Sequence, residues 1–315
     1  MTDDPYISVV MSVYNNEDTL AAAMESILSQ EGVTFEFIVI DDGSTDQSPA
    51  LLDDYARRDQ RIRVIHQNNQ GLTAALKTGC ARARAPWIAR QDADDVSLPG
   101  RLAALRDLAA GYPEAAMLGS SARYVGPAGE RLLEQRCTPD PEVARKQVRE
   151  LGIGPPAHGC VMFSRKYYEQ AGGYRACFYY GQDSDLWMRL AEQGEVAYLE
   201  EVYYQYRISP GAISGARRRL QKRFGRLGQA CRDARRAGKS EAPFLEEAEA
   251  LTRSIREGRI PPPRPRDQWL SFYHIGCLLE STDPEAAMAY FTSARVRHPW
   301  HWRPRYKLWR LGSRN

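Results

Sequence analysis

The sequence lacks any run of about 18 consecutive apolar residues, the length that a membrane-spanning helix requires. It also lacks a basic segment followed by an apolar run near Met1, so we expect no secretory signal peptide and a cytoplasmic location. The six cysteines are scattered and none stands in a C-x-x-C pair, which argues against zinc or a disulfide framework and favours reduced thiols. No G-x-G-x-x-G motif follows the first expected strand, which disfavours a dehydrogenase.

The composition is that of a packed protein in two parts. The 315 residues, of which 43% are hydrophobic, suffice for one large α/β domain and an appendage. The net charge of +3 hides an asymmetry, because residues 1–214 sum to about −9 and residues 215–315 to about +12. We therefore predict a domain over residues 1–214 and a basic α-helical region over residues 215–315.

Strand and helix patterns alternate through the first hundred residues. Short apolar segments rich in β-branched residues are typical of buried parallel strands, and the segments between them repeat apolar residues at helical spacing. The expected strands are 7–13, 35–40, 61–65 and a fourth that starts at Trp87, and helices are expected over about 48–58 and 72–84. This order predicts a mostly parallel, Rossmann-like α/β sheet with right-handed crossovers.

Polar clusters follow three of these strands. They are the segments 12–15 (Ser-Val-Tyr-Asn), 41–44 (Asp-Asp-Gly-Ser) and 92–95 (Asp-Ala-Asp-Asp). Each cluster alone is equally typical of a turn or a helix cap. Ligands of such sheets bind beyond the carboxyl ends of the strands, where the three clusters should converge. Because clustered carboxylates repel one another, the convergence favours a site for a hard divalent cation and a nucleotide diphosphate.

Several motifs, in order, resemble family 2 glycosyltransferases. The matching segments are Val9 to Asn15, Val39 to Asp46, Asn69-Gln70-Gly71, and Asp92 to Asp95 followed by Pro99 and Arg101-Leu102. The resemblance covers roughly residues 6–214. The members that this chain resembles are enzymes of bacterial cell-surface polysaccharide and lipopolysaccharide synthesis. It implies the GT-A fold and inverting transfer of a hexose or N-acetylhexosamine.

The resemblance also implies a nucleotide site at the first two strand ends. Ser12 and Tyr14 would flank the base, Tyr14 by stacking, while Asp42 would accept a hydrogen bond from the base and Asp41 would shape the turn beside it. The family often has Arg-Asn where this chain has Leu76-Lys77. Lys77 would then supply the cationic contact, with a solvated lysine on the helix face as the alternative.

For the third cluster, the resemblance implies a metal site that holds Mn²⁺ or Mg²⁺. Asp94 would be the main metal ligand, together with Asp95, and Asp92 would contact either the ribose or the metal.

The second half of the domain would bind the acceptor and the diphosphate. Asp183 occupies the position of the family's general base, preceded by Gln182 where the family has Glu, and followed by Trp187 on the same helix. A capping aspartate is the alternative for Asp183. His158 would lie near the donor diphosphate, and Arg207 would contact it or else form an ordinary ion pair.

The basic region reads as helices near 217–237, 245–255, 269–279, 284–296 and 303–311, with a proline-rich linker at 261–265. Residues 298–310 interleave aromatic and cationic side chains, among them Trp300, Trp302 and Trp309. They could lie on an anionic membrane surface, at the inner face of the cell membrane, or pack against the preceding helices. A homo-oligomer contact is also left open, whereas no recognition motif supports nucleic acid binding.

The function that these observations predict is an inverting, metal-dependent transfer of sugar from a nucleotide-sugar donor, a UDP-sugar, to a glycan or lipid-linked acceptor. A sugar-nucleotide nucleotidyltransferase is the first alternative, although no glycine-rich activating loop with Arg and Lys follows the first strand. The second is a non-catalytic nucleotide- or sugar-binding partner in a polysaccharide assembly complex, against which the four carboxylates Asp42, Asp92, Asp94 and Asp183 argue.

Overall fold

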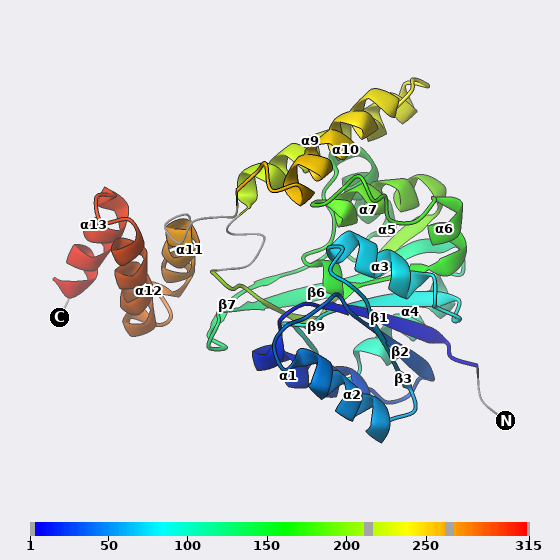
Figure 1. Ribbon diagram of the computed structural model, residues 1–315, viewed down its shortest axis with the longest axis horizontal. Helices are drawn as coiled ribbons and strands as arrows, with labels where there is room; N and C mark the ends of the chain where they lie inside the picture. The colour runs from blue at the N-terminus through cyan, green and yellow to red at the C-terminus, as the bar shows by residue number, and fades with distance from the viewer. Residues whose placement is uncertain (1–3, 211–216, 262–267, 314–315) are drawn as a thin grey trace.

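The computed structural model describes residues 4–210, 217–261 and 268–313. An α/β body carries two groups of C-terminal helices (Figure 1). The expected domain boundary between residues 214 and 215, the loop after Pro210 and most of the linker at 261–265 lie outside the described residues.

A nine-stranded mixed sheet forms the body, in the order β3-β2-β1-β4-β8-β6-β9-β5, with β7 paired to β6. Strands β1 to β4 are mutually parallel, which confirms the predicted βα alternation. Strand β8 runs antiparallel to β4 and β6, and β6 runs parallel to β9. The strands are β1 Ile7–Val13, β2 Phe35–Asp41, β3 Ile62–His66, β4 Trp87–Asp92, β5 Val96–Ser97, β6 Ala115–Val125, β7 Arg131–Gln135, β8 Val161–Ser164 and β9 Glu195–Arg207.

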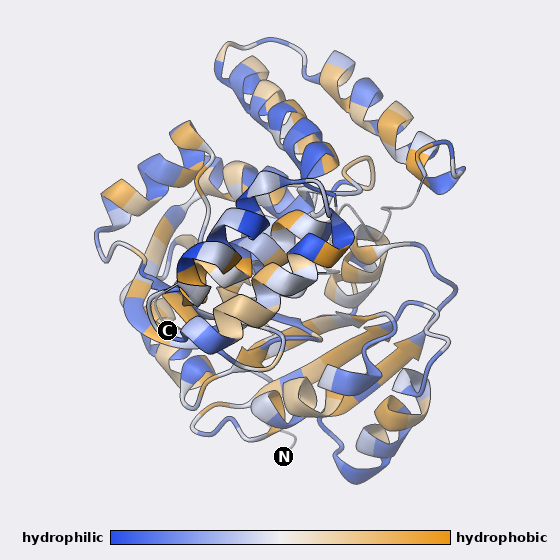
Figure 2. Ribbon diagram, turned by 90° about the vertical axis from the view of Figure 1, so that its left-hand side faces the viewer, coloured by the Kyte–Doolittle hydropathy of each residue, from blue (hydrophilic) through white to orange (hydrophobic). Residues whose placement is uncertain are grey.

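Helices cover both faces of the sheet, which is why its central strands are mostly apolar and almost wholly buried (Figure 2). In β1, Val9 and Met11 enter one core and Val10 enters the other, as the alternation of side chains along a strand requires. The first core packs under α1 Glu17–Leu28, α2 Ser48–Arg58 and α4 Arg101–Gly111. The second packs under α3 Leu72–Cys80, α5 Pro141–Lys146 with its π-helical continuation η1 Gln147–Leu151, α6 Arg165–Gln170 and α7 Gln182–Gln193.

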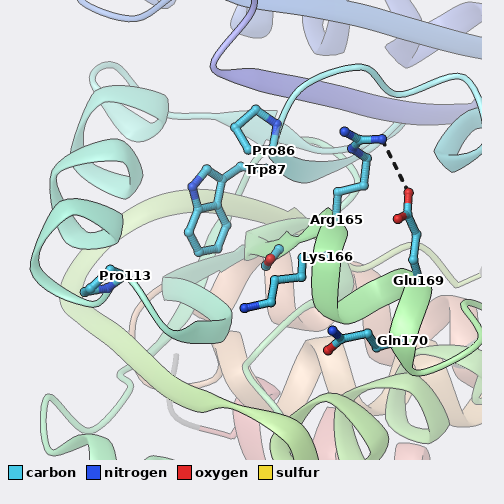
Figure 3. A pocket seen from close by; sticks show the side chains of 8 residues that line it. Pro86, Trp87, Pro113, Arg165, Lys166, Glu169 and Gln170 are labelled. Carbon is cyan, nitrogen blue, oxygen red and sulfur yellow. Dashed lines mark hydrogen bonds and ion pairs between the residues drawn. The ribbon is translucent and has the colours of Figure 1, made fainter.

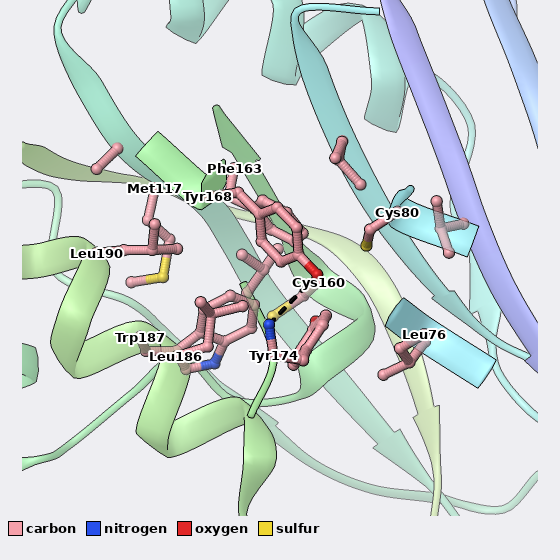
Figure 4. Close-up of a cluster of buried hydrophobic side chains, with 14 of the residues drawn as sticks. Leu76, Cys80, Met117, Cys160, Phe163, Tyr168, Tyr174, Leu186, Trp187 and Leu190 are labelled. Carbon is pink, nitrogen blue, oxygen red and sulfur yellow. Dashed lines mark hydrogen bonds between the residues drawn. The ribbon is translucent and has the colours of Figure 1, made fainter. Parts of the chain in front are cut away.

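The second core is rich in aromatic rings (Figure 4). Phe163 of β8 stacks on Tyr168 of α6 at a centroid distance of 5.3 Å, and Trp187 of α7 lies 5.8 Å from Phe163. The Tyr168 hydroxyl accepts a hydrogen bond from the backbone N–H of Tyr174 at 3.3 Å. This packing fixes the loop before α7, and with it the start of the helix that carries the predicted base.

Three elements differ from the sequence prediction. Helix α3 ends at Cys80 rather than Arg84, because the N–H and guanidinium of Arg84 bond the buried Glu36 in a turn towards β4. The sequence also predicts a last strand over residues 200–207, but β9 begins at Glu195, since its first residues pair with β6. Helix α6 follows β8 at once, without the Gly or Pro signal that would announce a boundary.

The C-terminal helices lie close to the predicted positions and pack as two groups (Figure 1). Helices α9 Arg218–Arg236 and α10 Ala242–Arg256 share a small core with Phe178 and Tyr180 of the loop before α7. Helices α11 Trp269–Leu279, α12 Pro284–Arg297 and α13 Trp302–Gly312 pack on the β6–β7 hairpin around Leu132. There the hydroxyl of Tyr290 donates to Glu130 at 2.6 Å.

Candidate functional site

The pairing of β1 with β2 and β4 brings the three polar clusters to one edge of the sheet. Ser12 stands opposite Asp92 in the register of β1 and β4, and Val13 stands opposite Asp41 in that of β1 and β2. The edge therefore presents side chains from three adjacent strands, as their order in the sequence predicts.

A buried arginine that the sequence prediction missed lies beneath this edge. Arg90 of β4 has no exposed surface, and its guanidinium forms a 2.7 Å ion pair with Asp92 and donates to the carbonyl of Val10. Its Nε donates to Nε2 of His158 at 3.3 Å. A cation in an otherwise apolar strand, two residues before an aspartate, is the signal that could have identified it.

A close approach of two other elements supports the same strand end. The hydroxyl of Tyr204 in β9 accepts the N–H of Asp92 at 3.2 Å. A Cβ added to Gly159 would lie only 1.8 Å from that hydroxyl, so only glycine leaves room for it. Arg101, also without exposed surface, lies 5.0 Å from the centroid of the Tyr204 ring and donates to the carbonyl of Arg90 at 2.9 Å.

The acidic turn after β4 is held by backbone contacts, while its carboxylates repel one another. The Gln91 amide donates to the carbonyls of Asp92 and Asp95, at 3.0 Å each. Burial and the charge of Asp92 raise the pKa of Asp94 to about 6. Burial and the charge of Asp94 raise the pKa of Asp95 well above its ordinary value.

The donor chemistry of this turn fits a hard cation, because carboxylate oxygens are the ligands that Mg²⁺ and Mn²⁺ prefer and a cation would relieve the repulsion. Across the described ranges 4–210, 217–261 and 268–313, no three His, Cys, Asp or Glu side chains are arranged to hold an ion by themselves. A bound cation would therefore need oxygens from a diphosphate or water as well.

The two carboxylates at the end of β2, Asp41 and Asp42, accept several hydrogen bonds from within the protein. Asp42 accepts the Gln67 amide at 2.7 Å and the backbone N–H groups of Gln70 and Gly71 at 3.0 and 2.8 Å, where α3 begins. Asp41 accepts the N–H of Ser44 and lies 2.7 Å from Nδ1 of His66.

Two predicted nucleotide contacts lie at the surface. The Tyr14 ring is 49% exposed at the end of β1, so it can stack on a flat group. Lys77 is exposed on α3.

Helix α7 carries the predicted base in its first turn. Asp183 is half-buried in the first turn, where it accepts the N–H of Ser184 at 2.8 Å. Burial raises the pKa of Asp183, the charge of Asp92 raises it further, and the charge of Arg90 lowers it. Asp92 and Arg90 therefore both lie within electrostatic reach of Asp183. Gln182 beside it is buried.

His158 and Trp187 pack together behind these carboxylates. Their ring centroids are 5.5 Å apart at an interplanar angle of 73°, and Nε2 of His158 lies 2.7 Å from the Tyr174 hydroxyl. Burial and the charge of Arg90 lower the pKa of His158 well below its ordinary value. Because Arg90 can only donate, Nε2 is the acceptor, and the neutral ring carries its proton on Nδ1.

Arg207 at the end of β9 forms hydrogen bonds to the acidic turn and to the β6–β7 hairpin, and among the described residues it forms no ion pair. Its N–H donates to Asp95 at 2.8 Å, and its guanidinium donates to the carbonyls of Asp94 at 3.1 Å and Pro127 at 2.9 Å. It therefore fixes the acidic turn against the β6–β7 hairpin.

A network of ion pairs joins the start of α7 to the basic helices. Asp185 is buried and paired with Arg189 at 2.7 Å and with Arg175. Arg175 also pairs at 2.8 Å with Glu241, which precedes α10. Glu241 in turn pairs at 2.7 Å with Arg235 of α9. The helix that carries Asp183 is thus anchored to α9 and α10.

A cavity of about 440 Å³ lies at the opposite edge of the sheet (Figure 3). It is lined by Trp87, the first residue of β4, and by Arg165, Lys166 and Glu169 of α6. Because Asp92 ends the same strand, this cavity is separate from the candidate site.

Comparison with known proteins identifies relatives of the chain. The family described as glycosyl transferase family 2 matches residues 8–172. A Bacillus subtilis (strain 168) protein named as a glycosyltransferase, EpsE, is 34% identical over 221 residues, which cover 68% of this chain and 77% of EpsE. The succinoglycan biosynthesis protein ExoO of Rhizobium meliloti (strain 1021) is 44% identical over 99 residues, 31% of this chain and 28% of ExoO.

Solved structures with the same fold extend over nearly the whole chain. S. aureus TarS 1-349 in complex with UDP superposes with a TM-score of 0.57 at 15% identity. The match covers 97% of this chain and 88% of the TarS chain. The mannosyltransferase PcManGT of Pyrobaculum calidifontis, with GDP-Man and Mn²⁺, has a TM-score of 0.55 at 17% identity, covering 95% and 88%.

The contact between Gly159 and Tyr204 predicts an unusually sensitive glycine. Gly159→Ala should lower the free energy of unfolding by about 2 kcal/mol, because the added methyl group displaces the Tyr204 hydroxyl. Gly111→Ala is the matched control, since a Cβ there meets nothing within 4 Å. Urea denaturation of both variants measures the difference, and equal unfolding free energies would contradict the assignment.

The ion-pair network predicts that Glu241 contributes more stability than an exposed glutamate of α10. Glu241→Gln should lower the free energy of unfolding by about 1–3 kcal/mol, because it leaves two largely buried arginines without their shared partner. Glu247→Gln, which removes an exposed pair with Arg223, should cost less than about 1 kcal/mol. Chemical denaturation compares the two, and a larger loss for Glu247→Gln would refute the role of the network.

Proposed function

Because the chain belongs to glycosyl transferase family 2, and is therefore a glycosyltransferase, we propose that it moves a sugar from a UDP-sugar to a hydroxyl group of a glycan or lipid-linked acceptor, with inversion. The observation that carries the proposal is the position of Asp183. A carboxylate with a raised pKa stands at the start of α7, within electrostatic reach of Asp92 at the end of β4. A base and an acidic strand end that suits a cation are thus available to one site.

The donor assignment draws support from the solved structures with this fold. TarS was solved with UDP and with UDP-GlcNAc, and PcManGT with GDP-Man and Mn²⁺. All three ligands are nucleotides that carry a diphosphate. For this chain we propose a hexose or N-acetylhexosamine donor, with Ser12, Tyr14, Asp41 and Asp42 on the nucleotide side and Lys77 as a cationic contact.

In the proposed reaction Asp183 takes the proton of the acceptor hydroxyl as its oxygen attacks the anomeric carbon. The bond from that carbon to the diphosphate oxygen breaks on the opposite face, so the anomeric centre inverts and the nucleoside diphosphate leaves with the electron pair. The raised pKa of Asp183 makes it a stronger base than an exposed aspartate, and it acts only while deprotonated, so activity should fall as the pH drops through that raised value.

The remaining charged groups position the donor in this proposal. Asp94 and Asp95 would hold Mn²⁺ or Mg²⁺, with Asp92 on the ribose or the metal, and the cation supplies Lewis-acid neutralisation of the leaving diphosphate. His158, neutral and protonated on Nδ1, would donate a hydrogen bond to the diphosphate. Gln182 and Trp187 would orient the acceptor side, and Arg207 would hold the acidic turn in place.

No helix among residues 4–210, 217–261 and 268–313 is both long and apolar enough to span a bilayer. A cytoplasmic location, with the C-terminal region in peripheral contact with the membrane, is part of the proposal.

Asp183→Asn tests the base. It should lower kcat by roughly 10²–10⁴, because the amide cannot take the proton while its size is unchanged. Sugar transfer from UDP-GlcNAc and UDP-hexoses to a glycan acceptor is the measurement, and Asp107→Asn, a change at an exposed carboxylate, is the control. A near wild-type rate for Asp183→Asn would rule out this base.

Asp94→Ala tests the metal and nucleotide half of the site independently. With UDP at 100 times its Kd and Mn²⁺ present, the wild type should gain about 2.7 kcal/mol of stability, by mass action. Asp94→Ala should lose the metal-dependent part of that gain, whereas Asp183→Asn should keep it. Thermal unfolding with UDP, GDP, Mn²⁺ and Mg²⁺ measures both, and an unchanged shift for Asp94→Ala contradicts the assignment.

A further inference from the structure

Helix α13 carries exposed aromatic rings in a continuous stripe. Trp302, Tyr306 and Trp309 are 65%, 47% and 69% exposed, and Trp300 in the preceding turn is 86% exposed. The ring centroids of Trp302 and Tyr306 are 6.5 Å apart, and those of Tyr306 and Trp309 are 6.1 Å apart. The alternative that these tryptophans pack against the preceding helices is therefore wrong. Exposing several large rings together is costly for a soluble surface and marks an interaction site.

The opposite face of α13 is fixed, so the exposure of the stripe follows from the packing. Leu311 and Pro304 are buried, and Leu308 packs against the core formed with α11 and α12. Glu280, just after α11, forms ion pairs with both Lys307 and Arg310. Helix α13 is also the element of this group farthest from the sheet (Figure 1).

The charged side chains of α13 itself are all cationic. Helix α13 contains four cationic side chains and no carboxylate over Trp302–Gly312. Arg303 and Arg305 are exposed, and neither forms an ion pair with any residue in the described parts of the chain. Arg303 lies 5.7 Å from the centroid of the Trp302 ring.

From this geometry we infer that the outer face of α13 docks onto an anionic lipid bilayer. The aromatic rings enter the headgroup region, where an apolar body and a polar edge are both accommodated, while the two unpaired arginines meet lipid phosphates. A second copy of the chain fits less well, because a symmetric contact would bring the arginines of both copies together without an acidic partner. The inference depends on no step of sugar transfer.

Vesicle binding by the full-length chain tests the inference. The protein should co-sediment with vesicles of phosphatidylcholine and phosphatidylglycerol, should bind pure phosphatidylcholine much more weakly, and should be released as salt is raised. The triple variant Trp302→Ala, Tyr306→Ala, Trp309→Ala should bind roughly tenfold or more weakly, since it removes the rings that enter the headgroups. Arg303→Gln with Arg305→Gln should weaken binding to anionic vesicles roughly 30-fold and leave binding to pure phosphatidylcholine unchanged.

A matched control removes exposed apolar side chains elsewhere. Val143→Ala, Leu151→Ala, Ile153→Ala changes residues that are 42%, 56% and 53% exposed beside α5 and η1, and should bind vesicles like the wild type. UDP-induced thermal stabilisation should be unchanged in every variant, which separates a failure of docking from a failure of the nucleotide site.

Three results would overturn the inference. The first is that the wild type does not bind vesicles, and the second is that the α13 triple variant binds them as well as the wild type does. The third is that the wild type is a dimer by light scattering with or without lipid, while the triple variant is a monomer. The last result would assign the stripe to a second copy.

Discussion

Arg90 brings a full positive charge into the middle of a sheet whose two faces are both covered by helices. Such a charge is tolerated only with partners, and it has three: the carboxylate of Asp92, the carbonyl of Val10 and the imidazole of His158. These come from the end of β4, from β1 and from the segment before β8. The need to neutralise one guanidinium therefore holds together the elements that form the candidate site.

The same constraint determines protonation around the site. Burial and, after it, the charge of Arg90 oppose protonation of His158 by lowering its pKa, so the histidine is neutral and can only donate through Nδ1. Towards Asp183 it acts in the other sense, partly offsetting the burial that raises the pKa of that carboxyl. Burial and one buried cation together thus give a neutral histidine, and a carboxylate whose pKa is raised by burial and only partly lowered by Arg90, as the proposed general-base chemistry requires.

The parallel strands β1 to β4 and the meeting of their polar ends could be predicted from the sequence, because both follow from local periodicity and the topology of βα units. The contacts that hold the site in place could not be predicted in this way. Tyr204 reaches Asp92 across 112 positions of the chain, and the space it needs depends on Gly159, which no local pattern links to either residue. The contacts of Arg207 with the carbonyl oxygens of Asp94 and Pro127 could not be predicted either, because every residue has a carbonyl group and no sequence pattern selects these two.

The excess positive charge of the C-terminal region is used in two different ways. In α9, Arg235 is paired with Glu192 of α7 and with Glu241, so its charge stabilises the contact with the α/β body. In α13, Arg303 and Arg305 project from the body beside exposed rings. A net charge counted over the whole region cannot separate these uses, since pairing depends on which helix meets the acidic domain. Part of the charge of α9 is thus used in ion pairs with the α/β body, whereas the exposed arginines of α13 lie beside exposed aromatic rings.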